Sequence, residues 1–168
     1  FGFPIGEKQS LSFGMGVDQT SISTFDNSST SIKQFVADNG ETNLTIPLTA
    51  NWISDGKDSY LFPTTGWYQK AALEVAIPGG DLTFYKASYQ LQRYFAISRS
   101  FTLMLNGEVG YGDSYGDTKA LPFYKNFYAG GVNTVRGYKA GSLGPQDIYG
   151  NTIGANERVV GQTELLWA

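Results

Sequence analysis

The stretch YKASYQLQRYF, residues 85–95, predicts a β-strand with one apolar and one polar face. Successive side chains of a strand point to opposite sides of a sheet, so a period of two separates the two faces. The apolar face carries Tyr85, Ala87, Tyr89, Leu91 and Phe95, and the polar face carries Lys86, Ser88, Gln90, Gln92 and Tyr94. Arg93 is the exception, because it falls on the apolar face. We expect it to lie near the strand end, where its long side chain reaches a polar surface.

The same alternation recurs along the chain and predicts six strands, at residues 10–19, 42–54, 66–78, 82–97, 101–112 and 158–168. Short turns such as residues 78–81 favour antiparallel neighbours, whereas the connections at residues 20–41 and 113–157 are long. Loops of that length are unusual inside a compact domain and are often functional. Helical periodicity is almost absent. We therefore expect an all-β, antiparallel up-and-down sheet in one domain, residues 1–168.

Composition excludes several classes of chemistry. The net charge of −3 offers no basic stripe for nucleic acid, so we expect no nucleic-acid partner. The chain has no cysteine and no histidine, which removes disulfides, the usual zinc sites and a Ser–His–Asp triad. No catalytic residue, metal site or cofactor is predicted. On the polar face, we expect Glu74 and Glu108 to form charge pairs with Lys70 and Lys86 across the strands.

The predicted strands are suited to a bilayer. They reach about 9–11 residues, which is enough to cross a membrane when tilted. Charged residues make up 16% of the chain, against about 25% in globular proteins. Large aromatic side chains gather toward the strand ends, as in the interfacial girdles of membrane barrels: Trp52, Trp67, Phe95, Phe101, Tyr111 and Trp167. These features favour a transmembrane β-barrel over a soluble β-sandwich, although a sandwich shows the same alternation along one strand.

Six strands cannot close around a polar interior, since barrels of about eight strands already fill their lumen with side chains. An open membrane sheet would leave unpaired strand edges in lipid, which is prohibitively costly. The chain also ends within an apolar run, at residues 165–168. We therefore expect it to be an incomplete segment of a larger transmembrane barrel.

The long second connection carries a recognisable motif. The segment LPFYKNFYAGGVNTVRGYKAGSLGP, residues 121–145, resembles the signature of the BamA family of bacterial outer-membrane barrel-assembly insertases. The mark of that family is a Val-Arg-Gly-Phe/Tyr tetrapeptide, matched here by Val135, Arg136, Gly137 and Tyr138. The segments GFPIGEKQSLSFGMG, YLFPTTGW and GEVGYGDSYG are similar to other parts of its barrel, so the resemblance spans nearly the whole chain.

The resemblance implies that the tetrapeptide lies in a long extracellular loop that folds back into the barrel. The family arginine meets a glutamate on the next strand, and Glu164 takes that position here, with Thr163 where the family has leucine. A second acidic partner would lie beyond Ala168. The chemistry is consistent with this, because a guanidinium fork suits a bidentate carboxylate and lysine does not reproduce it. Glu164 also shares the polar face with Gln162.

The residues around the arginine suggest how the loop docks. Gly130, Gly131 and Gly137 would let the backbone bend sharply and approach the wall. Val135 and Tyr138 would then pack beside the ion pair and exclude water.

The resemblance implies a function in the outer membrane of a Gram-negative bacterium. The whole protein would form a barrel of about sixteen strands and would fold and insert client β-barrel proteins. Its partners would be these clients, accessory lipoproteins of the assembly machinery and the lipid bilayer. One alternative is a two-partner-type polypeptide secretion pore of the same superfamily. A second is a soluble β-sandwich binding module.

Overall fold

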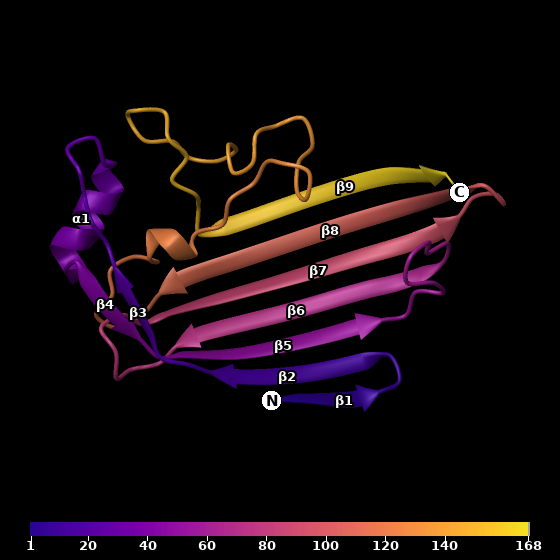
Figure 1. Ribbon diagram of the computed structural model, residues 1–168, viewed down its shortest axis with the longest axis horizontal. Coiled ribbons are helices and arrows are strands. Elements are labelled where there is room, and N and C mark those ends of the chain that lie inside the picture. The colour runs from indigo at the N-terminus through magenta and orange to yellow at the C-terminus, as the bar shows by residue number, and fades with distance from the viewer. Residues whose placement is uncertain (168) are drawn as a thin grey trace.

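The computed structural model describes residues 1–167 and shows one open, antiparallel seven-stranded sheet (Figure 1). Its strands, in sheet order, are β1 (Gly2–Gly6), β2 (Gln9–Met15), β5 (Pro47–Asp55), β6 (Gly66–Ala76), β7 (Phe84–Ala96), β8 (Phe101–Ser114) and β9 (Glu157–Trp167). Strands that are neighbours in the sheet follow one another along the chain, with β3 and β4 left out of this sheet. The predicted all-β, up-and-down architecture is confirmed, with β1 and β9 at the two edges of the sheet.

The register places side chains of like polarity beside one another across the strands. One row of directly paired residues consists of Leu11, Trp52, Ala71, Tyr89, Val109 and Val159. The adjacent row on the opposite face consists of Ser12, Asn51, Ala72, Ser88, Gly110 and Arg158. The apolar face is open, since Leu73 is 44% and Val159 81% exposed. A sandwich would bury such a row against a second sheet, whereas a membrane barrel presents it to lipid.

Two predicted strands are divided where they leave this sheet. The first predicted strand, residues 10–19, ends at Met15, and β3 (Asp18–Ser21) follows. The second, residues 42–54, consists of β4 (Thr42–Thr45) and β5, and β3 pairs with β4 in a separate two-stranded sheet. Pro47 lies at the division and has no backbone N–H to donate. Strand β1 was not predicted, because Pro4 and the glycines at its ends interrupt the alternation.

The first long connection contains a helix that the sequence analysis did not predict. Helix α1 (Thr30–Asn39) begins after Ser29, whose hydroxyl accepts a hydrogen bond from the Ile32 N–H, and it ends at Gly40, where φ is 85°. Phe35 is buried on its inner side, 5.7 Å edge-to-face from Phe123 of the short helix η1 (Phe123–Lys125). Among residues 1–167, no helix has the length and apolar character that a membrane span requires.

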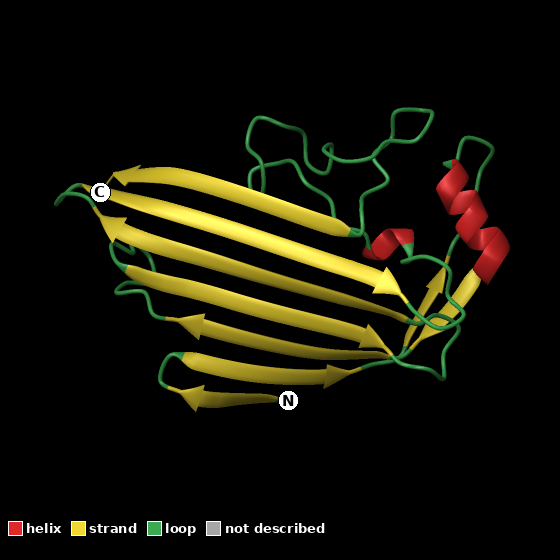
Figure 2. Cartoon of the chain, turned by 180° about the vertical axis from the view of Figure 1, so that it is seen from behind, coloured by secondary structure: helices red, strands yellow, loops and turns green. Residues whose placement is uncertain are grey.

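The two long connections lie at the same end of the sheet (Figure 2). We call this the loop end; it carries β3, β4, α1 and the long loop, residues 115–156. The opposite end, the turn end, carries the connections at residues 7–8, 56–65 and 97–100. The short connection at residues 77–83 also lies at the loop end, so only the two long connections set this end apart.

Removing the aromatic contact of α1 tests what holds the helix in place. We expect Phe35→Ala to raise amide hydrogen exchange across residues 30–39 of the full-length protein, because the ring contacts Phe123 and Tyr124. We expect the free energy of local unfolding of the helix to fall by about 2 kcal/mol, somewhat less than the cost of the same truncation in a large hydrophobic core. This decrease corresponds to roughly 30-fold faster exchange. Phe25→Ala is the matched control, since Phe25 is 71% exposed. Equal exchange in both variants would contradict the assignment.

Candidate functional site

The long loop lies against the polar face of the sheet through side chains of the wall strands. Lys86 of β7 donates to the Lys125 carbonyl at 2.6 Å, and Arg158 of β9 donates to the Tyr128 carbonyl at 2.7 Å. Within the loop, isolated β-bridges join Phe127 to Ala155, Ala129 to Leu143 and Gln146 to Thr152. The loop is therefore a folded element with several attachment points, all on the polar face.

The structure brings together the arginine and the glutamate singled out by the sequence. Arg136 Nη2 lies 2.9 Å from Glu164 Oε1, which β9 presents on the same face as Gln162. The glycines have the backbone conformations that such a bend requires, with φ of 110° at Gly130, 96° at Gly131 and 87° at Gly137. At Gly130 a Cβ would also lie 2.4 Å from the Lys139 carbonyl oxygen, so no other residue fits there.

The surroundings of this ion pair differ from the expectation. The two side chains meet through Arg136 Nη2 and Glu164 Oε1. The Arg136 side chain is 65% exposed and Tyr138 is 55% exposed, while Val135 is half-buried. Tyr138 therefore does not exclude water from the pair. Within the described residues, Arg136 lies against β9, the last strand of this sheet.

A second contact, which the sequence analysis missed, places an aromatic ring against a glycine of the sheet. The Phe127 ring lies on Gly110 of β8, where an added Cβ would stand 2.5 Å from Phe127 Cε1. Lys86 Nζ lies 4.1 Å and Arg158 Cζ 5.4 Å from the ring centroid. The negative face of an aromatic ring attracts such cations. We call Lys86, Glu108, Gly110, Phe127 and Arg158 the Phe127 cluster.

The charge pairs of the polar face are not the predicted ones. Glu108 forms an ion pair with Arg158, and Glu74 forms one with Lys125 of the long loop at 2.5 Å. Lys86 lies opposite Glu74 in the strand register but donates to the loop backbone. The prediction paired glutamates with lysines of the wall only. Alternation could have found Arg158, because it shares the even positions of β9 with Gln162 and Glu164.

A row of amides connects the wall to the motif. Gln90 Nε2 donates to Asn106 Oδ1 at 3.0 Å, and Asn106 Nδ2 donates to Gln162 Oε1 at 2.6 Å. Gln162 then donates to the Thr134 carbonyl, two residues before Arg136. The arrangement binds and positions a loop through hydrogen bonds. Within residues 1–167, no three or more His, Cys, Asp or Glu side chains are grouped to hold a metal ion.

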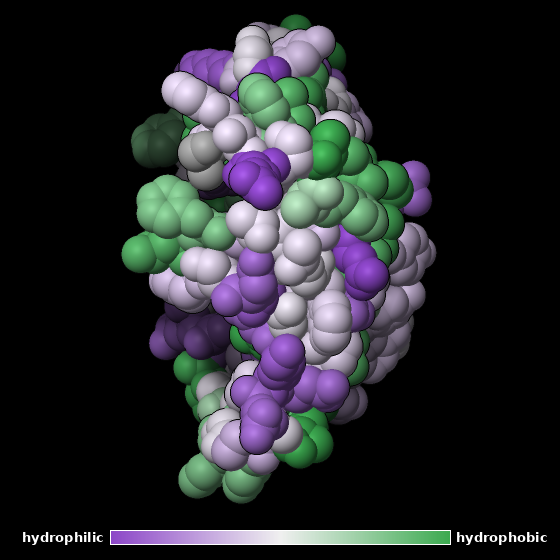
Figure 3. Space-filling model, turned by 90° about the vertical axis from the view of Figure 1, so that its right-hand side faces the viewer, coloured by the Kyte–Doolittle hydropathy of each residue, from purple (hydrophilic) through white to green (hydrophobic). Residues whose placement is uncertain are grey.

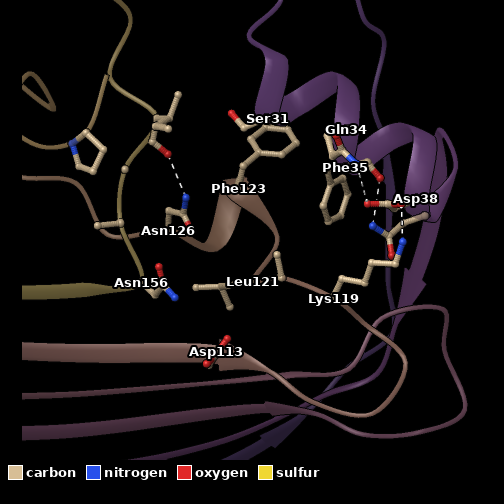
Figure 4. A pocket seen from close by; sticks show the side chains of 16 residues that line it. Ser31, Gln34, Phe35, Asp38, Asp113, Lys119, Leu121, Phe123, Asn126 and Asn156 are labelled. Carbon is tan, nitrogen blue, oxygen red and sulfur yellow. Dashed lines mark hydrogen bonds and ion pairs between the residues drawn. The ribbon is translucent and has the colours of Figure 1, made fainter. Parts of the chain in front are cut away.

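A cavity of about 530 Å³ separates α1 from the long loop (Figure 4). Phe35, Leu121 and Phe123 line it, and its polar groups largely bind one another. Lys119 Nζ contacts Asp38 Oδ1 at 2.7 Å, and this hydrogen bond lowers the pKa of Asp38 below its usual value. The cavity thus marks where the two long connections of the loop end meet.

An antiparallel sheet with an exposed apolar face, and a polar face that holds a folded-back loop, defines the wall of a transmembrane β-barrel. The particular family follows from comparison: the Omp85 superfamily domain matches residues 1–168, and the chain belongs to that superfamily. It is part of an outer-membrane β-barrel.

Relatives and a solved structure agree with this assignment. The chain is 36% identical to the outer membrane protein assembly factor BamA of Neisseria meningitidis serogroup B, over 98% of this chain and 22% of that protein. It is 34% identical to the sorting and assembly machinery component 50 homolog of Mus musculus, over 56% of this chain and 20% of that protein. The crystal structure of Haemophilus ducreyi BamA lacking POTRA domains 1–3 has the same fold. Its TM-score is 0.87 at 24% identity, over 98% of this chain and 35% of that one. The chain thus spans about a fifth of the length of these curated relatives.

Proposed function

We propose that the protein carrying this chain is a β-barrel assembly factor that folds and inserts β-barrel proteins into the outer membrane of a Gram-negative bacterium. The observation that carries the proposal is the likeness of 98% of the chain to a BamA. Its partners would be client barrels, accessory lipoproteins and the bilayer. It would act through binding and positioning, without a cofactor or catalytic chemistry.

In this proposal, the segment supplies a firm part of the wall and the loop docked against it. Three separate contacts support the docking: the Arg136–Glu164 pair, the Gln162–Thr134 hydrogen bond and the Phe127 cluster. Several weak attachments along one loop hold it better than any one of them alone. A loop held in this way keeps the polar face in one shape while strands elsewhere in the barrel rearrange.

Depletion of the full-length protein tests the function itself. We expect unrelated outer-membrane barrels to lose their folded, heat-modifiable forms together, because an assembly factor serves them all. Purified full-length protein in proteoliposomes should also accelerate the folding of a urea-unfolded barrel. If barrels insert normally and a single secreted polypeptide is retained in the cell, the secretion-pore alternative is correct.

Arg136→Ala tests the docking of the motif in the full-length protein. In the described segment the Arg136 side chain is 65% exposed. With that exposure the ion pair contributes about 0.5–1 kcal/mol, which corresponds to a two- to five-fold faster cleavage of the loop by proteinase K. Arg136→Lys should lie between the parent and the alanine variant, because it keeps a cation near Glu164 but loses the guanidinium geometry. A lysine variant as sensitive as the alanine variant would show that the guanidinium geometry, and not the charge alone, holds the loop. An alanine variant as resistant as the parent would contradict docking through this pair.

A further inference from the structure

Arg93 is an arginine on the face that meets lipid. It lies on β7, directly paired with Trp67 of β6 and Leu105 of β8, and its side chain is exposed. Because both neighbours of β7 belong to this chain, no other strand of the barrel can cover this position. Within residues 1–167, no carboxylate forms an ion pair with it. A cation on an apolar membrane surface is costly unless an anion meets it.

A second cation shares the same aromatic ring. Arg93 Cζ lies 5.9 Å and Lys8 Nζ 5.8 Å from the ring centroid of Trp67. The indole lies flat across Gly56, where a Cβ would stand 2.5 Å from Trp67 Cε2. Its Nε1 donates to Ser54 Oγ at 3.1 Å, which fixes the ring. Gly56 therefore leaves the space in which the Trp67 ring, on β6, lies near both Arg93 of β7 and Lys8 of the first turn.

The acidic side chains of the turn end are mostly engaged with other groups. Asp55 pairs with Lys57 at 3.5 Å. Asp58 accepts hydrogen bonds from the Thr64 hydroxyl and from the backbone of Thr64 and Thr65, which hold its pKa well below the usual value. Glu7 remains, beside Lys8. Figure 3 faces this end and shows hydrophilic side chains between hydrophobic ones. Within residues 1–167, neither Arg93 nor Lys8 forms an ion pair with any of these carboxylates, and both lie beside the Trp67 ring.

We infer that Arg93, Lys8 and Trp67 form a binding site for the phosphate group of a glycerophospholipid, in the leaflet at the turn end. The guanidinium fork matches phosphate oxygens, and the ammonium adds a point charge. Tryptophan prefers the headgroup level of a membrane. Farther from the turn end, exposed Leu91 and Val109 continue the same face and would meet the acyl chains. On the outer face of a barrel, the phosphate of a lipid headgroup is the anion that lies at this level.

Lipid retention by the full-length protein tests the site. The protein is reconstituted with phosphatidylglycerol, extracted gently, and its bound lipids are counted by native mass spectrometry. We expect Arg93→Gln and Lys8→Gln each to reduce the retained lipid about five-fold, which is the contribution of one cation near an anionic membrane surface. The double variant should retain less lipid than either single variant. Inorganic phosphate and glycerol phosphate should not compete at millimolar concentration, since they lack acyl chains.

Two controls make the outcome specific. Arg99→Gln removes an exposed cation from the adjacent turn, and Lys70→Gln removes one from the polar face. Both should retain lipid like the parent, and all variants must show the folded, heat-modifiable form. The inference is overturned if the double variant retains as much lipid as the parent, if Arg99→Gln loses as much as Arg93→Gln, or if free phosphate displaces the lipid.

Discussion

Replacing Gly110 with alanine is expected to displace the first part of the long loop from the sheet. The new methyl group would stand 2.5 Å from Phe127 Cε1, well inside van der Waals contact. Because β8 is hydrogen-bonded on both sides, the strand cannot give way, and the ring must leave. The ring then also loses its position beside Lys86 and Arg158. Overpacking of this kind costs about 1–3 kcal/mol.

The measurement is limited proteolysis of the full-length protein, with cleavage sites mapped over residues 115–156. We expect cleavage about 5- to 160-fold faster than in the parent, the range that corresponds to that cost. Gly107→Ala is the matched control on the same strand, because nothing lies within 4 Å of its added Cβ. The role given to Phe127 is wrong if both variants are cleaved at the parental rate. It is also wrong if Gly107→Ala is as sensitive as Gly110→Ala.

The sheet could be predicted from the sequence because strand alternation is a local property. The alternation around Val109 and Glu108 is enough to assign these two residues to opposite faces of the sheet. The strand register then places apolar residues beside apolar ones and polar residues beside polar ones. The features that the sequence analysis did not predict depend on contacts between residues far apart in the chain. Helix α1 is ten residues long and is held by Phe123, far along the chain, so its weak local signal was not sufficient. The division at Pro47 likewise reflects pairing of β4 with β3 outside the main sheet.

The candidate site shows the same limit. The resemblance predicted which glutamate lies near Arg136, and the structure brings the two together at 2.9 Å. It gave no information on Phe127, because an aromatic residue within a glycine-rich loop has no pattern that assigns it to a strand glycine 17 positions earlier. The exposure of Arg136 also could not be read from sequence, since it depends on which strands lie beside β9.

Arg158 is expected to be the most costly side chain of the Phe127 cluster to remove. Its guanidinium pairs with Glu108, donates to the Tyr128 carbonyl and lies beside the Phe127 ring. The side chains of the pair are only 19% and 21% exposed. Arg158→Gln would leave Glu108 largely buried without a partner, at a cost of about 2–3 kcal/mol after allowance for partial exposure. Urea unfolding of the full-length protein in micelles measures this loss.

A double-mutant cycle separates the lost pair from lost packing. Glu108→Gln alone leaves the guanidinium unpaired but keeps its hydrogen bond to the Tyr128 carbonyl, so it should cost less than Arg158→Gln. The double variant has no unpaired charge. It should therefore be less destabilised than the sum of the two single variants, by about 1–2 kcal/mol. Additive losses would mean that Arg158 acts through the loop backbone and the Phe127 ring, and that its pairing with Glu108 contributes little to holding the loop.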